Sequence, residues 1–560
     1  MKKIKRKNLK NLIEIMFLII ALMVIVSCKK KDEAKPIITL KGNKEITIDD
    51  GGQYKELGVI ATDNVDGDIS KNVKISFLKD DKAVEKIDVN ISGKYLVKYL
   101  VKYLVEDSSG NVSDEISRIV IINKKIEEKA DNNTTFVKVG TANLRDNMGK
   151  SGVKVALLTK GTELKVIKEV KDEAGVEWLN VEYHDKLDKK NAWIKKEFTT
   201  KKREELINPK YRNLDYSSYE KKEYPKNPKV KVKGIYLTIY SAGGKKIDSL
   251  IEMTKHTEIN AFVIDVKDDN GYLLFPMKAG EKFAPKANQK NTIKDINVLM
   301  KKLKDNNIYT IARIVSFKDP IYTETYPERA IVYKDTKKPF TNSDNLTWAT
   351  AYDRQLWEYN ISVAKEAIAA GFNEVQFDYV RFPASNGGKL DKILDYRNLK
   401  NESKAQVLQE YLKYARKELS PLQAYISADV YGLVSSVEDD MALGQYWEGI
   451  SNVVDYISPM VYPSHYGNGT YGLSIPDAFP YETVFNSGRD AIRRNNIIST
   501  PATIRPWIQD FTASWVKGHI KYGDTQVAEQ IRALKENGID EYLLWNASNR
   551  YSEKAVRSVK

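Results

Sequence analysis

Hydrophobic and polar positions follow different patterns before and after residue 232. Beyond this residue, short apolar runs alternate with segments whose apolar residues recur every three or four positions, which is the spacing of one helix face. The eight apolar runs are, in order, KGIYLTIYSAGG, NAFVIDVKDDNG, IYTIARIVSF, EVQFDYVRFP, QAYISADVYG, VVDYISPMVYP, IISTPATIRPW and EYLLWNAS. Eight strands that alternate with helices predict one (β/α)₈ TIM barrel at residues 232–560.

The segments between these runs carry helical faces. Three such faces are Ile247, Leu250, Ile251 and Thr254; Ile293, Ile296, Leu299, Met300 and Leu303; and Val407, Leu408, Tyr411, Leu412 and Ala415. An open doubly wound sheet would show the same alternation, but it usually carries a glycine-rich phosphate turn after its first strand. The turn YSAGGKK lacks the G-x-G-x-x-G spacing, so the pattern favours the barrel.

Residues 36–123 show the shorter runs of an all-β domain, divided by Gly, Asp and Asn. The stretch KYLVKYLVKYLV repeats a four-residue unit, which places Tyr and Val on one face of a strand and Lys and Leu on the other. The segment resembles bacterial immunoglobulin-like surface domains, whose pattern includes ATDNVDGDI and a final SGN turn. Its DNVDGD motif is open to two interpretations, a Ca²⁺ site of Asp63, Asp66 and Asp68 or a polar turn.

Residues 135–198 predict a second small β domain. The pair Leu144 and Arg145, the turn KGT at residues 160–162, Trp178 and Trp193 resemble bacterial SH3-like domains. That resemblance implies contact with cell-wall peptides or peptidoglycan, and a plain spacer is the alternative. Residues 199–231 are rich in Lys and Glu with several prolines, which predicts a semi-extended, exposed linker.

The N-terminus has the pattern of a targeting segment. Basic residues precede an apolar run at residues 15–26, which is too short to span a bilayer comfortably and suits a signal peptide. The run ends on IVSC, which resembles the bacterial lipobox, and Cys28 is the only cysteine of the chain. We therefore expect a signal peptide at residues 1–27, lipidation of Cys28, and a protein anchored to the membrane of the cell envelope, facing the outer membrane or cell surface where two membranes exist.

Polar and aromatic side chains gather where the predicted barrel strands end, which is where TIM barrels carry their chemistry. They are Asp265, Lys267 and Asp268; Arg313; Asp378 and Arg381; Asp429 and Tyr431; Tyr462 and His465; Arg505; and Trp545 and Asn546. Because side chains alternate along a strand, Asp378 shares a face with Gln376, and that face should point into the barrel. The alternative is structural pairing of the charges, for example Asp378 with Arg381 or Arg313.

Carboxylates ringed by aromatic residues suit glycosidic chemistry, in which one carboxyl acts as acid and another as nucleophile or base. Asp378, Asp429 and Asp265 are therefore the expected catalytic residues. The expected substrate-binding residues are Asp268, Arg313, Arg381, Tyr431, Tyr462, His465, Arg505 and Trp545. With four histidines in the chain and no G-x-S-x-G motif, the sequence favours neither a catalytic metal nor a serine nucleophile, and we expect no cofactor.

The net charge of +14 comes from lysines interleaved with acids along the chain. This pattern suits an anionic surface such as a membrane or a cell-wall polymer, and the chain shows no nucleic-acid module.

The runs GIYLTIYSAGG, NAFVIDVKDDNG, VQFDYVRFP, ISPMVYPSHY and PATIRPWIQDF resemble a glycoside hydrolase-like family of bacterial envelope proteins with TIM barrels. The resemblance covers residues 232–560 and implies that Asp265, Asp268, Asp378 and Arg381 are site residues. A more distant comparison is with chitinase-like barrels, whose D-x-D-x-E motif ends strand four. Asp378 matches its last Asp, but Val380 replaces the acid Glu, so the acid must come from elsewhere, with Asp429 the first choice.

These observations predict an envelope-anchored glycoside hydrolase that acts on a cell-wall or extracellular polysaccharide. The alternative is a lipoprotein that binds carbohydrate or cell wall without cleaving it. A free pair of carboxylates about 5 to 9.5 Å apart would favour the enzyme, and a fully salt-bridged set would favour the binding protein.

Overall fold

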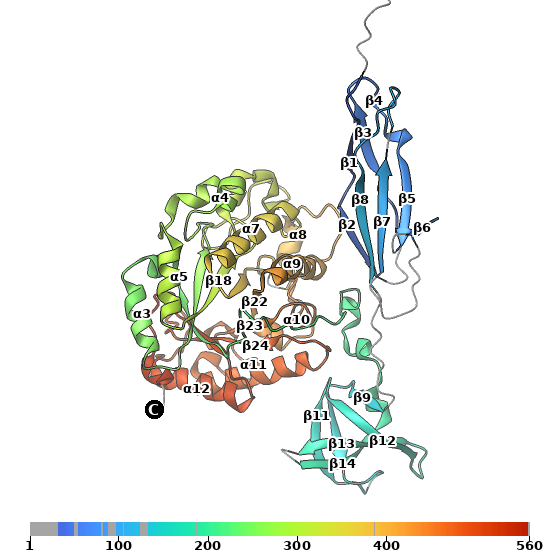
Figure 1. Ribbon diagram of the computed structural model, residues 1–560. Coiled ribbons are helices and arrows are strands. Elements are labelled where there is room, and N and C mark those ends of the chain that lie inside the picture. Colours follow the sequence, from blue (N-terminus) through green and yellow to red (C-terminus); the bar gives the residue numbers. More distant parts are fainter. Residues whose placement is uncertain are drawn as a thin grey trace, which may run out of the picture. The chain divides into compact units, whose positions relative to one another are not determined.

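The computed structural model describes residues 32–49, 54–79, 82–87, 97–104, 106–123, 133–149, 151–185, 188–385 and 387–557. The chain divides into two compact units, Met1–Glu128 and Lys129–Lys560, which are described separately (Figure 1). The predicted signal peptide and Cys28 lie outside the described residues. Within the described ranges, no helix is both long and apolar enough to span a bilayer.

The first unit is the predicted immunoglobulin-like domain, built from two sheets. One sheet has the order β1-β3-β4 and the other β2-β8-β7-β5-β6, with β2 parallel to β8. The strands are β1 (Ile37–Leu40), β2 (Glu45–Asp49), β3 (Val59–Asp63), β4 (Gly67–Asp68), β5 (Lys74–Lys79), β6 (Lys82–Val84), β7 (Val97–Leu104) and β8 (Ile116–Asn123). Residues Val97–Leu104 of the KYLV repeat form β7, which pairs antiparallel with both β5 and β8, as its Tyr and Val content predicts.

The second unit begins with a seven-stranded all-β domain in the order β11-β10-β14-β13-β12-β9-β15. Its strands are β9 (Thr134–Val137), β10 (Thr141–Arg145), β11 (Lys154–Thr159), β12 (Glu163–Lys171), β13 (Glu177–Asp185), β14 (Asp188–Lys195) and β15 (Thr199–Thr200). Leu144, Val181 and Ile194 are fully buried in its core. The all-β prediction is confirmed, and the SH3-like assignment stays a prediction.

Residues 199–231 differ from the exposed linker that their composition predicted. The segment contains two 3₁₀ turns, Arg203–Leu206 and Pro209–Tyr211. Leu206 packs with Phe136 of the small β domain and Ile497 of the barrel, and Tyr211 stacks on Tyr446 of the barrel at 4.0 Å. Its apolar residues are too irregularly spaced to form a helix or strand face, but they bury against the surfaces on either side.

The barrel is closed and parallel, and it confirms the predicted fold. Eight strand positions follow one another around the barrel, with β22 and β23 paired to close it. They are β16 (Lys233–Leu237), β17 (Ala261–Lys267), β18 (Tyr309–Val315), β20 (Glu374–Asp378), β22 (Tyr425–Tyr431), β23 (Tyr456–Val461), the seventh position split into β24 (Thr503–Ile504) and β25 (Trp507–Gln509), and β26 (Tyr542–Trp545). A short antiparallel pair of strands, β19 (Val332–Tyr333) and β21 (Leu394–Asp395), lies outside the barrel sheet.

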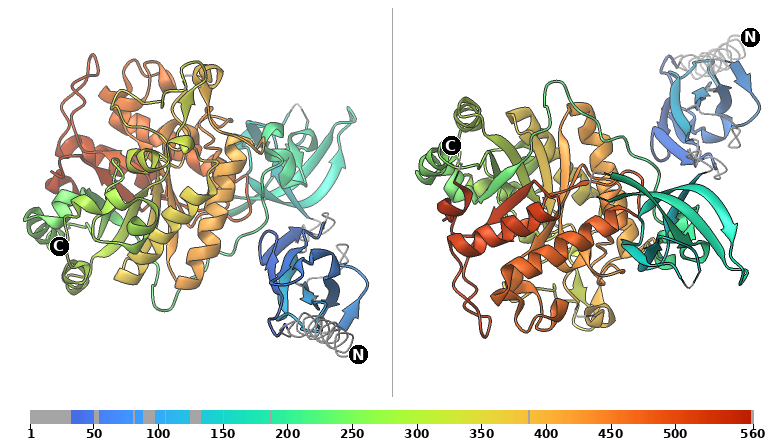
Figure 2. Two further views of the ribbon diagram at one scale, coloured as in Figure 1. Left: turned by 90° about the horizontal axis from the view of Figure 1, so that it is seen from above. Right: turned by 90° about the horizontal axis from the view of Figure 1, so that it is seen from below.

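Helices cover the outside of the strands (Figures 1 and 2). They are α2 (Ile239–Gly243), α3 (Lys246–Thr254), α4 (Lys278–Phe283), α5 (Ile296–Asp305), α6 (Pro320–Thr325), α7 (Arg354–Ala370), α8 (Lys389–Ile393), α9 (Lys404–Leu419), α10 (Trp447–Ser451), α11 (Pro480–Asn495) and α12 (Asp524–Glu536). Helix α9 shows why they form: Ser403 caps its first turn, and its predicted apolar face, including Tyr411, is buried.

Two cores result from the alternation of side chains along the strands. On β20, Val375 and Phe377 face the helices, where Phe377 meets Tyr411 of α9 at 5.3 Å. Inside the barrel, Val263 of β17 and Ile311 of β18 belong to a separate cluster. The inward residues that follow them, two positions further along each strand, form the site at the carboxyl ends of the strands.

Candidate active site

Arg313 is the centre of the carboxyl end of the barrel. It follows Tyr309 and Ile311 on the inward face of β18 and is almost fully buried. Its Nη1 donates to Asp265 at 2.5 Å, its Nε and Nη2 donate to Asp378 at 2.9 and 2.6 Å, and Nη2 also reaches Asp269 at 3.1 Å. The predicted substrate-binding arginine thus organises three carboxylates.

Asp378 is the last residue of β20 and is held on both oxygens. Arg313 binds Oδ2, and the backbone N–H of Tyr379 donates to Oδ1 at 2.6 Å. Tyr379 has a φ of 48°, a conformation that a bulky residue rarely adopts. This bend ends the strand and breaks the side-chain alternation. The ring centroid of Tyr379 lies 4.0 Å from Nζ of Lys318 and 5.7 Å from the ring centroid of Trp348.

Asp429 lies on the neighbouring strand β22 and has a different environment from Asp378. It is 1% exposed, and its one hydrogen-bond donor is the indole N–H of Trp507, at 2.8 Å from Oδ1. Burial, followed by the negative charge of Asp378, raises the pKa of the Asp429 carboxyl well above its ordinary value. The surroundings of Asp429 therefore favour the protonated form of its carboxyl group, whereas the neighbouring Asp378 is ion-paired with Arg313.

Asp265, the third expected catalytic residue, also points inward from β17. It accepts hydrogen bonds from Arg313 and from the hydroxyl of Tyr236, which lies 2.5 Å from Oδ2. Burial raises the pKa of Asp265 to about 7, although Arg313 and Tyr236 oppose the shift. The structure thus places Asp265 with Asp378 and Asp429 at one end of the barrel.

The acidic pair after β17 is used differently from the prediction. The carboxylate of Asp268 accepts the backbone N–H groups of Asn270 and Tyr272 at 2.9 and 2.8 Å, which stabilises the turn. Asp269 instead faces the site, where it binds Arg313 and Lys318. Burial opposes its ionisation, but these two cations outweigh it and lower the pKa of the Asp269 carboxyl.

Lys267 was expected beside these acids but points to the other side of the strand. The pairing of β17 with β18 shifts register between Asp265 and Lys267, as in a β-bulge, and this reverses the alternation. The ammonium of Lys267 is fully buried against α7, with Asp319 at 2.7 Å and Asn360 at 2.6 Å. This pair joins β17 to the helix layer.

Arg381 does not pair with Asp378. Its guanidinium lies over the rings of Trp348, Tyr379 and Tyr431, at 4.9, 5.1 and 5.2 Å from their centroids. It is 8% exposed, and Nη1 donates to the carbonyl of Phe382 at 2.9 Å. Tyr431 is thus positioned with Arg381, as expected of two site residues at neighbouring strand ends.

Aromatic residues extend outward from the inner carboxylates. Trp545 of β26 stacks on Tyr236 at 4.1 Å, and Tyr462 meets both Trp545 and His465, at 6.3 and 5.3 Å. Beyond them, Phe511 and Trp515 stack on each other at 6.0 Å. Trp515 is 68% exposed, and it was not among the substrate-binding residues expected from the sequence.

Arg505 lies at the opposite end of the barrel from the site for which it was predicted. It is fully buried and pairs with Glu374 at 2.9 Å and Glu541 at 2.8 Å. Glu374 begins β20 and Glu541 directly precedes β26, so all three belong to the amino ends of the strands. The seventh strand is interrupted between Ile504 and Trp507. Arg505 therefore lies near the amino ends of the strands and not at their carboxyl ends, as its place in the apolar run predicted.

The structure adds four polar partners that sequence reasoning did not name: Tyr236, Asp269, Lys318 and Trp507. Tyr236 and Trp507 lie inside the barrel by the same two-residue alternation that placed Asp265 and Asp429, so counting along β16 and β25 could have found them. Asp269 and Lys318 lie on loops, where that alternation does not apply.

A family model described as "Putative glycosyl hydrolase domain" matches residues 234–551, which is more than half of the chain. The chain belongs to this family. A second model, "Bacterial surface protein, Ig-like domain", matches residues 38–122 and indicates an extracellular or surface protein. The family of the barrel thus agrees with the resemblance carried by the DVKDD and FDYVRFP motifs. No curated protein matches the chain.

Solved structures with similar chains include glycoside hydrolases. A hypothetical protein from Ruminiclostridium thermocellum is 35% identical over 35% of this chain and 97% of its own, with a TM-score of 0.31. The glycoside hydrolase domain of PgaB (BpsB) from Bordetella bronchiseptica is 12% identical over 59% of this chain and 99% of its own, with a TM-score of 0.43. The α-galactosidase TtGalA from Thermus thermophilus is 9% identical over 74% and 84%, with a TM-score of 0.36.

Proposed function

We propose that the barrel hydrolyses glycosidic bonds in a cell-wall or extracellular polysaccharide. The observation that carries the proposal is the contrast between Asp378 and Asp429 on adjacent strands. Arg313 supplies the countercharge for the Asp378 carboxylate, whereas burial and that same carboxylate raise the pKa of Asp429. Two carboxyl groups whose environments differ in this way divide naturally into a base or nucleophile and an acid.

In this reaction Asp429 donates its proton to the departing glycosidic oxygen. Asp378 either attacks the sugar carbon or activates a water molecule, and its negative charge stabilises the oxocarbenium-like transition state. Asp265 and Tyr236 support Arg313, which fixes the position of Asp378. The aromatic faces of Trp545 and Trp515 suit the apolar faces of sugar rings.

A carbohydrate-binding protein without hydrolytic activity is the second candidate. It is favoured by the ion pairs of Asp265, Asp269 and Asp378 with Arg313, which engage three of the acidic residues at this end of the barrel. Asp429 supports hydrolysis over simple binding, because a carboxyl group with a raised pKa beside these ion pairs is of use to an acid catalyst.

Incubation of the full chain with purified peptidoglycan and a panel of extracellular polysaccharides tests the two candidates together. A hydrolase releases new reducing ends from at least one polymer, and the Asp378→Asn and Asp429→Asn variants release far fewer. Binding of a polymer by calorimetry with no release of reducing ends would support the binding protein instead.

The envelope location belongs to the same proposal. It is supported by the IVSC motif with its single cysteine and by the surface-protein family of the immunoglobulin-like domain. Lipidated Cys28 would hold the chain on the membrane, and the small β domain at residues 135–198 would contact peptidoglycan. Cys28→Ser should abolish labelling by a radioactive fatty acid and release the protein from the membrane fraction. Unchanged fractionation would refute the lipid anchor.

A further inference from the structure

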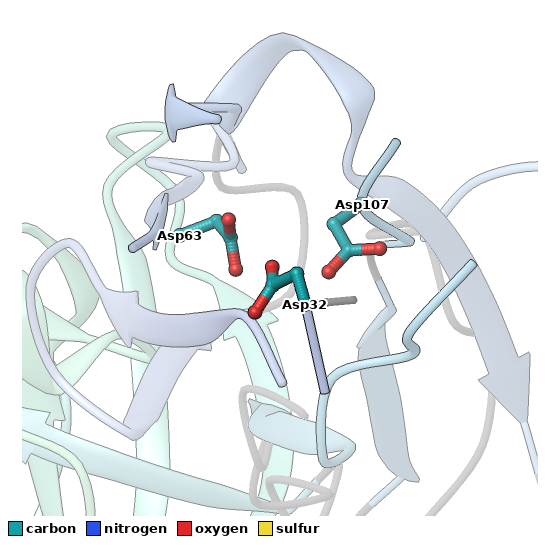
Figure 3. A group of neighbouring side chains, drawn as sticks. All are labelled: Asp32, Asp63 and Asp107. Carbon is teal, nitrogen blue, oxygen red and sulfur yellow. The ribbon is translucent and has the colours of Figure 1, made fainter. Parts of the chain in front are cut away.

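Three carboxylates meet in the immunoglobulin-like domain, far from each other in the sequence. Asp32 precedes β1, Asp63 ends β3 and Asp107 follows β7. One oxygen from each lies within 4.8 Å of the others, and the three side chains point toward one another (Figure 3). Two oxygens bound to one Ca²⁺ at about 2.4 Å can be at most about 4.8 Å apart, so the spacing fits a single ion.

A second observation is that two carboxylate oxygens of this group have no hydrogen-bond partner. Oδ2 of Asp32 and Oδ2 of Asp63 are both buried without any hydrogen bond. Asp107 is 7% exposed, and its carboxylate accepts N–H groups from Ser109 and Asn111 that fix its orientation. Buried carboxylate oxygens are costly unless a hydrogen bond or a cation compensates them, and three acids that converge repel one another.

The neighbouring aspartates of the DNVDGD motif do not join this group. Asp66 accepts the N–H and the hydroxyl of Ser108 at 2.8 and 2.7 Å, and Asp68 accepts the same groups of Ser70 at 2.9 and 2.6 Å. The Ca²⁺ set of Asp63, Asp66 and Asp68 suggested by the sequence is therefore not formed. Only Asp63 of that motif takes part in the converging group.

We propose that Asp32, Asp63 and Asp107 form a Ca²⁺ site that pins the start of the immunoglobulin-like domain to its two sheets. The donors are all hard carboxylate oxygens, and their flexible arrangement suits Ca²⁺ better than the strict octahedron of Mg²⁺. Asp32 lies four residues after Cys28, so the ion would fasten the chain close to the proposed lipid anchor.

Calorimetric titration of the full chain with CaCl₂ tests the site. One ion should bind with a dissociation constant of about 10⁻⁴ to 10⁻³ M, the range of extracellular modules. The unfolding transition of this domain should rise by about 5 °C or more at saturating Ca²⁺ relative to EDTA. Asp63→Asn and Asp32→Asn should each weaken binding at least about tenfold.

The matched control is Asp68→Asn, which removes the same charge from the same motif and should leave Ca²⁺ binding unchanged. Asp32 precedes the first strand, so Asp32→Asn tests the site even where Asp63→Asn fails to fold. The proposal is overturned by a wild-type chain that binds no Ca²⁺ at 5 mM, about five times the weakest expected constant. It is also overturned by binding that Asp32→Asn leaves intact, or by binding of Mg²⁺ in preference to Ca²⁺.

A second inference rests on the proposed function and concerns Arg381. A buried arginine normally pairs with a carboxylate, yet no carboxylate in the described part of the chain forms an ion pair with Arg381. Its one hydrogen bond is donated by Nη1. Nε and Nη2 have no partner, and both remain accessible to solvent. Nearby, Arg313 forms ion pairs with three carboxylates, those of Asp265, Asp269 and Asp378.

We infer that Arg381 binds a carboxylate of the substrate, so that the glycan is acidic. The three rings around the guanidinium hold its plane in place, which leaves two N–H groups ready for bidentate contact with a carboxylate. The ammonium of Lys318, 4.0 Å from the ring centroid of Tyr379, increases the positive potential at this point.

Oligosaccharides of several uronic acids, each compared with its own methyl ester, separate charge from sugar identity. The wild-type chain should bind at least one acid about tenfold more tightly than its ester, and Arg381→Gln should remove that difference while leaving ester binding unchanged. Equal binding of acid and ester by the wild type, no binding of either, or equal loss of both in Arg381→Gln would overturn the inference. Release of reducing ends is scored separately, so a bound but uncleaved acid would refute hydrolysis and leave the acidic subsite intact.

Discussion

The two ends of the barrel each contain a buried arginine among acids, and they differ in how completely the charges are satisfied. At the amino end, Arg505 binds Glu374 and Glu541, and Glu374 also accepts the hydroxyl of Ser427 at 2.6 Å. At the carboxyl end, Arg313 binds three aspartates, and Asp429 remains beside them with no cation of its own.

This difference separates a structural network from a functional one. At the amino end both acids contact the arginine, whose guanidinium lies 3.6 Å from the ring centroid of Tyr456, and only its Nη2 is left without a hydrogen bond. At the carboxyl end Asp429 has no cation partner and its pKa is raised well above the ordinary value, and burial raises the pKa of Asp265 to about 7, which a fold tolerates where chemistry requires it. Substitutions that remove the same charge at each end should therefore have opposite effects on activity and stability.

The largest effect is expected from Asp378→Asn. The amide keeps the shape of the carboxylate but cannot stabilise a positive transition state, so kcat/KM should fall by about 10³-fold or more. Arg313 keeps Asp265 and Asp269, so the free energy of unfolding should change by less than about 1 kcal/mol. Steady-state kinetics and urea denaturation measure both. A variant that unfolds would make Asp378 a structural partner.

The second prediction concerns the amino end, where Glu374→Gln is the matched change. It leaves Arg505 with Glu541 alone and places a neutral amide against the guanidinium in a fully buried site, so the free energy of unfolding should fall by about 3 kcal/mol. The folded fraction should keep its kcat, because Glu374 lies at the far end of the strands. A kcat loss as large as that of Asp378→Asn would remove the distinction between the two networks.

The third prediction uses the raised pKa of Asp429. Activity should decline as pH rises through this pKa, because the acid loses its proton, and Asp429→Asn should remove that limb of the pH profile and lower kcat by about 10²-fold. Substrates with good leaving groups should be affected least. An unchanged basic limb would assign the acid to another residue.

The same shift has a consequence for stability. The pKa of Asp429 is raised in the folded chain, so the unfolded chain loses this proton at a lower pH and the free energy of unfolding should decrease as pH rises from the ordinary pKa to the raised one. Asp429→Asn should remove this dependence and stabilise the protein at neutral pH. Urea denaturation at a series of pH values measures it.

The smallest effect is expected at Trp515. The aromatic residues of the amino end, such as Tyr425, are buried, whereas Trp515 at the carboxyl end is exposed. Trp515→Ala should raise KM about tenfold through loss of one sugar contact, with kcat and the melting temperature unchanged. Phe479→Ala, which removes another exposed aromatic residue, is a control that should leave KM unchanged.

Much of the barrel and the inner carboxylates could be predicted, because regular strands alternate strictly. Asp265, Arg313, Asp378 and Asp429 were found by counting in steps of two along continuous apolar runs. The predictions failed where a local irregularity changed the count. A register shift after Asp265 turned Lys267 outward.

Other irregularities displaced Arg505 and Asp268. An interruption of the seventh strand places Arg505 near the amino ends of the strands. The turn after β17 uses Asp268 for its own hydrogen bonds, so that Asp269 is the residue that binds Arg313. Such irregularities depend on pairing with distant strands, so a single sequence does not reveal them. In the immunoglobulin-like domain, the sequence pointed to Asp63 but not to its partners Asp32 and Asp107, which are 75 residues apart in the chain.

The packing of residues 199–231 separates two boundaries that are usually treated as one. The family match begins at residue 234, but Tyr211 and Tyr224 bury against Tyr446 and Tyr425 of the barrel well before that point. The unit that is inherited is therefore shorter than the unit that folds. A barrel that is moved into another protein therefore needs residues 199–231 as well. Without them, two aromatic surfaces of the barrel would be exposed and prone to aggregation.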